Sequence, residues 1–301
     1  MSQPRILLFG KNGQVGWELE RVLAPFGTVL AMGRAEVDLT DTARLTELVA
    51  QVKPALVINA AAYTAVDRAE SEPELAHQIN GVAPGVLAAA AQKAGAWLIH
   101  FSTDYVFDGT KRSPYVEIDV TNPLSVYGRT KLSGEQAIAA AGGRHLIFRL
   151  SWVYGLRGQN FLITMQRLAR ERAELRVVND QIGSPTWSKA IAEAVTPVAQ
   201  QLLSGEASDT LTGIYHLACA GRTSWHGFAS RIIEQMPATG RKAQAVVPIS
   251  TAEYPTPAKR PAYSVLDCSK LRRTFDVQLP EWEPALQRAL ISPPLQNSIT
   301  R

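Results

Sequence analysis

The amino-acid sequence predicts an α/β protein in which a doubly wound parallel sheet precedes a smaller C-terminal α/β domain. Short apolar runs alternate with longer amphipathic stretches through the first half of the chain, which is the pattern of repeated βαβ units. The apolar runs are continuous, as is typical of strands buried on both faces. A glycine-rich turn follows the first run, and small or hydroxyl-bearing residues follow later ones.

The expected elements follow from this alternation. Strands are expected at residues 5–9, 28–32, 55–59, 97–102 and 146–150, and helices at residues 14–23, 43–51, 73–94 and 125–141. Asp41 and Glu72 stand at two of the expected helix starts. Beyond Trp152 the pattern is less regular, with helices expected at residues 160–172, 188–203, 224–235 and 282–290 and short strands near 176–178 and 215–217. We expect a first domain over residues 1–151 and a second over residues 152–301, with some exchange of chain between them.

Length, charge and cysteine use narrow the class of protein. A chain of 301 residues can bury a large core without cross-links, and Cys219 and Cys268 lack the spacing of a zinc site or a disulfide framework. The N-terminal apolar run, residues 6–9, is too short for a signal peptide or a membrane span. A net charge of +4 with both signs interspersed lacks the basic stripes of a nucleic-acid surface. We therefore expect a cytoplasmic protein with neither a membrane nor a nucleic-acid partner.

The strongest local signal is the turn after the first strand. The sequence GKNGQVG places Gly10, Gly13 and Gly16 at the junction of the first strand and the first helix. Glycine permits a positive φ and a close approach of the backbone to a pyrophosphate, which the helix N-terminus stabilises. Such a trio alone is compatible with an ordinary turn, but its place at the first βα junction favours a dinucleotide site and a Rossmann-type sheet.

The end of the second strand bears on the choice of cofactor. An acidic residue there binds the ribose 2′-hydroxyl of NAD, whereas an arginine accommodates the 2′-phosphate of NADP. The strand runs into Gly33 and Arg34, with no acid at its tip. We therefore expect NADPH, with NADH as the alternative, although Arg34 is also compatible with an ordinary surface residue. Asp38 and Leu39 could flank the adenine.

The third strand ends in small residues. Ala60, Ala61 and Ala62 follow Asn59, and small side chains at the carboxyl end of a strand leave room for a cofactor. Tyr63 and Thr64 are then expected at the cleft.

Tyr127 and Lys131 stand four residues apart on one expected helix and so share a face. A neighbouring cation favours the ionised form of a phenol and lowers its pKa. In the reduction of a ketone, Tyr127 could protonate the developing alkoxide while Lys131 holds the nicotinamide ribose. A Y-x-x-x-K pair is by itself also compatible with surface charge, so a catalytic role also depends on its surroundings, that is, on which residues the neighbouring strands place beside it.

The fourth and fifth strands supply those surroundings. The fourth leads into Ser102, Thr103, Asp104 and Tyr105, which places polar groups at the edge where doubly wound sheets bind ligands. Thr103 is the candidate to donate a hydrogen bond to the substrate oxygen. After the fifth strand, Trp152 could belong to the core or close over a sugar.

Together these residues resemble the extended short-chain dehydrogenase/reductase superfamily and, within it, the dTDP-4-dehydrorhamnose reductases. The segments LLFGKNGQVGWEL, VINAAAYTAVDRAESEP, STDYVFDG, NPLSVYGRTKLSGE, FRLSWVYG, NDQIGSPT and YPTPAKRP carry the resemblance through nearly the whole chain. It implies that Tyr127 is the catalytic acid, Lys131 its partner and Thr103 a hydroxyl that tunes the pKa. It also implies cofactor contacts at Gly13, Gln14, Val15, Asp38, Leu39, Ala62, Tyr63 and Thr64, and substrate contacts at Thr103, Asp104 and Trp152. From their places at the strand ends, Gly10 is a further candidate for a cofactor contact and Tyr105 for a substrate contact.

The implied reaction is reduction of the C4 ketone of dTDP-4-dehydro-L-rhamnose to dTDP-L-rhamnose, a sugar donor for lipopolysaccharide and other cell-surface polysaccharides. Residues 1–151 would then bind NADP(H), and residues 152–301 mainly the nucleotide sugar. Arg260 and Gln181 are candidates to hold its diphosphate.

One departure from the family concerns a metal. Some relatives bridge subunits through magnesium held by carboxylates. Glu18 fits that arrangement, but Lys189 stands where a second acid would be expected. We therefore expect no metal site, and the resemblance leaves monomer and homodimer open.

Two rival functions share this fold. Some members of the superfamily are regulatory subunits that bind NADP and catalyse nothing, and nucleotide-sugar epimerases use the same tyrosine and lysine with a retained cofactor. The intact Thr103, Tyr127 and Lys131 argue against the first rival. Nucleotide-sugar dehydratases share the tyrosine and lysine too, but they commonly carry an Asp-Glu pair next to the catalytic hydroxyl. Here Thr103 is followed by Asp104 and Tyr105, which argues against a dehydratase.

Overall fold

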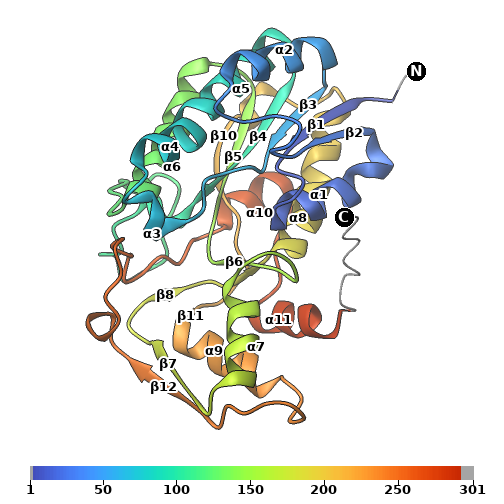
Figure 1. The fold of residues 1–301 in the computed structure, drawn as a ribbon. Coiled ribbons are helices and arrows are strands. Elements are labelled where there is room, and N and C mark those ends of the chain that lie inside the picture. The colour runs from blue at the N-terminus through green and yellow to red at the C-terminus, as the bar shows by residue number, and fades with distance from the viewer. Residues whose placement is uncertain (1–2, 293–301) are drawn as a thin grey trace.

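A computed structural model describes residues 3–292. Its centre is a six-stranded sheet in the order β10-β5-β4-β3-β1-β2, with every neighbouring pair parallel. The predicted doubly wound parallel α/β fold is confirmed (Figure 1).

The strands are β1 (Arg5–Phe9), β2 (Thr28–Met32), β3 (Leu56–Asn59), β4 (Trp97–Thr103), β5 (His145–Leu150), β6 (Val153–Tyr154), β7 (Glu174–Val178), β8 (Ile182–Gly183), β9 (Thr186–Trp187), β10 (Gly213–His216), β11 (Thr223–Ser224) and β12 (Ala245–Ile249). The helices are α1 (Gln14–Leu23), α2 (Thr42–Val52), α3 (Val66–Ala69), α4 (Pro73–His77), α5 (Ala83–Lys93), α6 (Val126–Ala141), α7 (Phe161–Glu171), α8 (Ser188–Leu203), α9 (Trp225–Glu234), α10 (Ser269–Phe275) and α11 (Trp282–Ile291).

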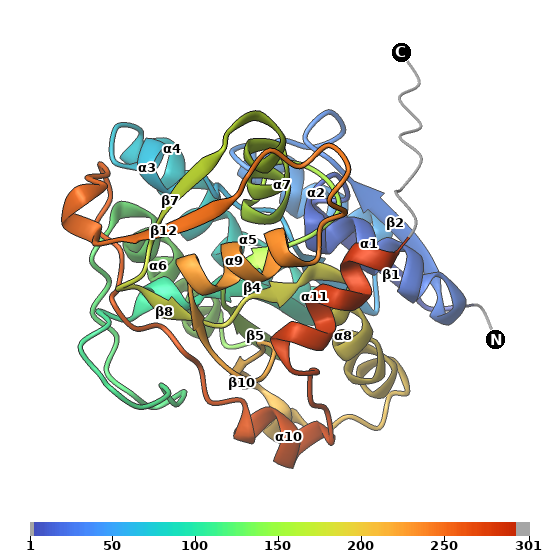
Figure 2. The same cartoon turned by 90° about the horizontal axis from the view of Figure 1, so that it is seen from below.

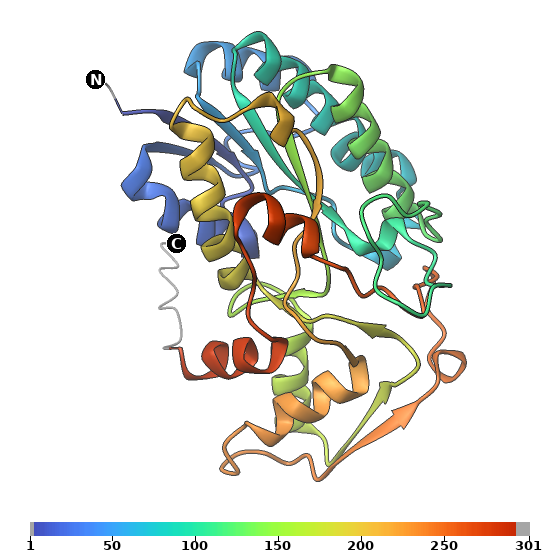
Figure 3. The same cartoon turned by 180° about the vertical axis from the view of Figure 1, so that it is seen from behind.

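The apolar runs are continuous because each sheet face carries its own core. In β1, Ile6 and Leu8 belong to the core beneath α1 and α8, whereas Leu7 and Phe9 belong to the core beneath α2, α5 and α6. Figures 1 and 3 show these two helical layers on opposite sides of the sheet. Successive side chains of a strand point to opposite faces, so a strand covered on both faces needs apolar residues at every position.

The second half of the chain contributes to both parts of the molecule. β10 extends the central sheet beside β5, and α8 packs against α1. The rest of this half builds a smaller layer, in which α9 packs on α7 and on the parallel pair β7 and β12 (Figure 2). The segment between β12 and α10 runs along the loop that connects β4 to α6 (Figure 3). There Tyr115 N donates to Val265 O, and Asp267 N donates to Tyr115 O.

The helix expected at residues 73–94 is interrupted. α4 ends at His77, a π-helical turn covers Gln78–Val82, and α5 begins at Ala83. Asn80 lies in this turn and is buried; its Oδ1 accepts from Tyr63 N at 2.9 Å and its Nδ2 donates to Tyr63 O at 3.0 Å. The turn thus fixes the segment that follows β3.

Candidate functional site

The main cavity has a volume of about 620 Å³ and lies at the carboxyl ends of the parallel strands, where doubly wound sheets bind ligands. Most of the residues singled out in the sequence line it: Gly10, Gly13, Gln14, Val15, Arg34, Ala62, Thr64, Thr103, Asp104, Tyr105, Tyr127, Lys131 and Trp152. Asp38, Leu39 and Tyr63, which the sequence analysis assigned to the cofactor, are not among its lining residues. Leu39 is buried in the core, and the hydroxyl of Tyr63 donates to Glu72 at 2.7 Å.

The glycine turn lies against the end of β3. Gly10 has a φ of +92°, and a Cβ on it would lie 2.7 Å from the backbone of Ala60. A Cβ on Gly16 would meet the carbonyl of Gly10. The N-cap of α1, Gly13, offers no side-chain cap, so the first N–H groups of this helix are open to an acceptor in the cavity. This arrangement suits a pyrophosphate.

The tip of β2 differs from the sequence-based expectation. Residues 33–36 form a tight turn, and Glu36 returns to the tip, where its Oε2 accepts from Gly33 N at 2.7 Å. Lys11 donates to Oε1 of the same carboxylate at 2.8 Å. The expectation of no acid at this tip is therefore wrong, because the acid comes from a residue three positions farther along the chain.

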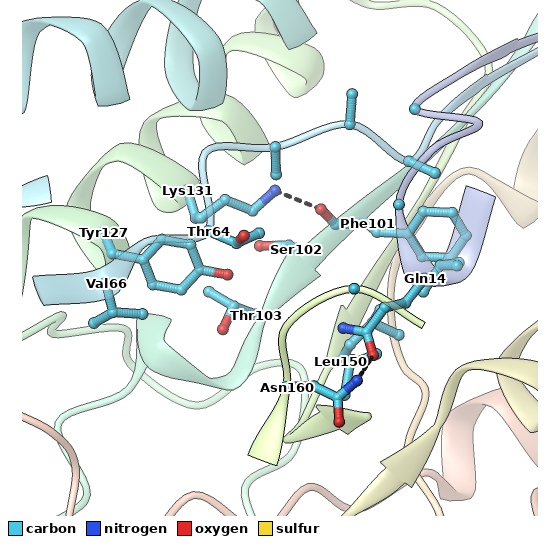
Figure 4. A pocket seen from close by; sticks show the side chains of 18 of the residues that line it. Gln14, Thr64, Val66, Phe101, Ser102, Thr103, Tyr127, Lys131, Leu150 and Asn160 are labelled. Carbon is cyan, nitrogen blue, oxygen red and sulfur yellow. Dashed lines mark hydrogen bonds between the residues drawn. The ribbon is translucent and has the colours of Figure 1, made fainter. Parts of the chain in front are cut away.

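The proposed catalytic side chains converge on one wall of the cavity. Ser125 caps α6 by accepting from Gly128 N, and the helix then presents Tyr127 and Lys131 to β4. Figure 4 shows the phenol of Tyr127 pointing toward Thr103 and the ammonium of Lys131 extending toward Phe101. Lys131 is 1% exposed and donates to the carbonyl of Phe101 at 2.5 Å.

Burial controls the pKa values of this pair. It raises the pKa of Tyr127 to about 12; the hydrogen bond with Thr103 opposes this effect and the charge of Asp104 adds to it. Burial also lowers the pKa of Lys131 to about 8, against the attraction of Glu135. The expectation that Lys131 lowers the pKa of Tyr127 does not hold in this structure, because the ammonium is directed to Phe101 and desolvation of the phenol dominates. Tyr127 is consequently protonated at neutral pH.

A buried ion pair supports the wall from behind. Arg149 donates to Glu135 through Nε at 2.9 Å and through Nη2 at 2.7 Å, and both side chains are 3% exposed. Ser102 donates to the same carboxylate. Together with Ser102, this pair joins β5, α6 and β4, and the latter two carry Lys131 and Thr103.

Asp104 lies behind Thr103 and is 2% exposed. Its carboxylate accepts from Thr103 Oγ1 at 3.1 Å and from Ser151 Oγ at 2.9 Å. Burial raises the pKa of Asp104 from 3.8 to about 6, against hydrogen bonds from Ser264, Ser151 and Thr103.

The raised pKa of Asp104 predicts a pH-dependent contribution to stability. The folded protein binds more protons than the unfolded chain between the two pKa values, so this contribution is complete below pH 3.8 and is lost as the pH rises through about 6. We expect the free energy of unfolding of wild type, measured relative to that of Asp104→Asn, to fall by about 2 kcal/mol from pH 4 to pH 7. Urea unfolding at a series of pH values measures it; parallel profiles for the two proteins would contradict this account.

The second half of the chain closes the cavity with Trp152 and with Trp225, which the sequence analysis did not assign. Trp225 stacks on Trp152 with ring centroids 3.5 Å apart and an interplanar angle of 3°, and both line the cavity. A Cβ on Gly183 would meet the indole of Trp152, which has a left-handed backbone with φ of +45°. Trp152 is therefore held rigidly at the cavity wall. No local sequence signal pairs these two tryptophans.

Asn160 is a second lining residue that the sequence analysis did not assign. Its Oδ1 accepts from Ile163 N as the N-cap of α7, while its Nδ2 donates to Gln14 at 3.0 Å (Figure 4). The N-cap pattern could have located it, because asparagine is a preferred N-cap residue.

Arg260 and Gln181 both have structural partners. Arg260 pairs with Asp67 at 2.8 Å, and Gln181 accepts from Trp225 Nε1 at 3.2 Å and donates to Thr251 at 3.0 Å. Neither is among the lining residues of the main cavity.

Within residues 3–292, no group of three or more His, Cys, Asp or Glu side chains is placed to hold a metal ion. Burial raises the pKa of Glu18, and the charge of Lys189 opposes this. In the same part of the chain, no helix has the length and apolarity required to cross a membrane.

Comparisons with known proteins show the family of this chain. A family model described as the RmlD substrate binding domain matches residues 4–292. The chain is 49% identical over 287 residues to a dTDP-4-dehydrorhamnose reductase of Burkholderia thailandensis, covering 94% of this chain and 96% of that one. The solved structure of a dTDP-4-dehydrorhamnose reductase of Clostridium acetobutylicum superposes with a TM-score of 0.87 at 39% identity, covering 95% of this chain and 98% of that one.

A dTDP-4-dehydrorhamnose reductase of Bacillus anthracis, solved in complex with NADP, gives a TM-score of 0.87 at 36% identity and covers 97% of this chain and 100% of its own. The family resemblance in the sequence is thereby confirmed. With its glycine turn, its Tyr127 and Lys131 pair and this similarity over nearly its full length, the chain belongs to the dTDP-4-dehydrorhamnose reductase family of oxidoreductases.

Proposed function

We propose that this protein catalyses the NADPH-dependent reduction of the C4 ketone of dTDP-4-dehydro-L-rhamnose to dTDP-L-rhamnose, with Tyr127 as the general acid. The observation that carries the proposal is the position of Tyr127, beside Thr103 and one helical turn from the buried Lys131, in the cavity that the glycine turn also lines. The similarity to reductases of this substrate, one of them in complex with NADP, supports it.

The cavity offers the groups that a dinucleotide needs. The open N–H groups at the start of α1 would hold the pyrophosphate, and Lys11 and Arg34 lie near the tip of β2, where a 2′-phosphate would be met. Ala60, Ala61 and Ala62 leave space beside them. When bound there, the dihydronicotinamide supplies the hydride.

The side chains of this wall perform the proton chemistry. Because its pKa lies well above 7, Tyr127 carries its proton at neutral pH and can donate it to the oxygen that develops negative charge. Thr103 lies beside the phenol and can donate a second hydrogen bond to that oxygen. Lys131 is near enough to hold a ribose hydroxyl by exchanging its bond to Phe101.

The two halves of the chain divide this work. Residues 1–151 supply the glycine turn and the catalytic wall, and residues 152–301 supply Trp152, Asn160 and Trp225, which would contact the sugar. We further propose that the protein acts in the cytoplasm, without magnesium, as a monomer or a homodimer.

The test is turnover of the purified full chain. With dTDP-4-dehydro-L-rhamnose present, we expect NADPH consumption to match the formation of dTDP-L-rhamnose. dTDP-L-rhamnose in place of the substrate serves as the control, because it lacks the C4 ketone. Tight NADPH binding without consumption, in the presence of verified substrate, would contradict the proposal and favour a non-catalytic regulatory subunit.

A further inference from the structure

The tip of β2 holds an ion pair that the catalytic wall does not use. Glu36 accepts from Gly33 N at 2.7 Å and from Lys11 Nζ at 2.8 Å. The glycine turn is bound to the same strand end, because Gly10 N donates to Met32 O at 2.8 Å and Lys11 N to the same oxygen at 3.3 Å. The ion pair is therefore fixed to the backbone that forms the cofactor cavity.

This ion pair borders the cavity directly. Gly33, Arg34 and Asn12 line the cavity, and a Cβ on Gly33 would lie 2.6 Å from Asn12 Nδ2 and 3.0 Å from Glu36 Oε2. The Glu36 side chain is 43% exposed and that of Lys11 is 27% exposed, so both can be reached by a ligand. The side chain of Arg34, which lines the cavity, is 82% exposed, and its Nε lies 3.8 Å from Asp38 Oδ2.

The carboxylate of Glu36 occupies a position suited to an anion. It receives a backbone N–H and a lysine ammonium, which are also the donors that hold phosphate groups in proteins. In sheets of this type, the group at this tip meets the 2′ position of the adenosine ribose, where a carboxylate accepts from a hydroxyl and repels a phosphate.

Resting on the proposed function, we propose that Glu36 and Lys11 together set the choice between NADH and NADPH. Glu36 favours the 2′-hydroxyl of NADH by accepting from it, and it disfavours the 2′-phosphate of NADPH by like charge. Lys11 has the opposite preference and pairs with the 2′-phosphate once Glu36 leaves Gly33 N. Because the two charges oppose each other, the ratio of NADPH to NADH affinity in the wild-type protein lies between the ratios of the variants that lack one charge or the other.

Binding of NADPH, NADH, 2′,5′-ADP and 5′-AMP by calorimetry tests this selectivity apart from catalysis. Glu36→Gln keeps the shape of the side chain and removes its charge, so the ratio of NADPH to NADH affinity should rise at least about tenfold. Lys11→Met should lower the same ratio at least about tenfold. The fragment pair 2′,5′-ADP and 5′-AMP should follow both changes, because the fragments differ only in the 2′-phosphate.

Matched controls remove the same charges elsewhere. Glu47→Gln neutralises an exposed carboxylate on α2, and Lys93→Met neutralises an exposed ammonium at the end of α5; neither should change the ratio more than about twofold. If Glu36→Gln and Lys11→Met bind NADPH and NADH with the same affinity ratio as the control variants, this inference is overturned and the proposed function is not affected. Failure of every nucleotide to bind the folded wild-type protein would overturn the proposed function as well.

Discussion

Replacing Tyr127 by phenylalanine is expected to lower kcat by about 10²- to 10⁴-fold, because the cavity then lacks its positioned proton donor. The ring still packs edge-on against Tyr105, at 5.9 Å between centroids, so the wall keeps its shape. The affinity for NADPH should stay within about threefold, since only the hydroxyl is removed. Steady-state kinetics and calorimetry on the same preparation measure both quantities.

A matched control for this change is Tyr254→Phe, which removes the same hydroxyl from a side chain on a residue that is 60% exposed. That variant should keep the kcat of wild type. If Tyr127→Phe also kept it, Tyr127 would be removed from the mechanism. Loss of both turnover and NADPH binding would instead assign the residue to the binding of the cofactor.

Arg149→Met is expected to lower the free energy of unfolding by about 3–5 kcal/mol, because it leaves the carboxylate of Glu135 buried without its cation. Removing Glu135 as well, in Arg149→Met combined with Glu135→Leu, should recover much of this loss, since a buried ion pair can be replaced by apolar side chains at little cost. Urea denaturation of the three proteins measures these differences.

The control for this prediction is Arg167→Met, which breaks an exposed ion pair with Glu171 on α7. It should cost less than about 1 kcal/mol. Equal losses in Arg149→Met and Arg167→Met would show that the buried pair does not support the catalytic wall.

The fold could be predicted from the sequence wherever one segment carried its own signal. The runs at residues 5–9 and 28–32 coincide with β1 and β2, because each is a short, mostly apolar run of the length of a strand. Asp41 caps α2 by accepting from Arg44 N, as its position before a helical pattern indicated. The interruption at Gln78–Val82 escaped, since its cause is the pairing of Asn80 with the distant backbone of Tyr63.

The candidate site could likewise be predicted only where its residues form local sequence patterns. Glycines at a βα junction and the tyrosine and lysine one turn apart are local patterns, and their residues meet in one cavity. Glu36 and Trp225 were missed because their places depend on contacts across the fold. Glu36 returns through a turn to Gly33, and Trp225 reaches the cavity by stacking on Trp152.

The most direct test of the central claim is a single turnover with NADPH that carries deuterium at the transferred position of the nicotinamide. The product from dTDP-4-dehydro-L-rhamnose should be dTDP-L-rhamnose with deuterium at C4, formed far faster by wild type than by Tyr127→Phe. Unlabelled product, label at another carbon, or equal rates for the two proteins would contradict reduction at C4 with Tyr127 as the acid.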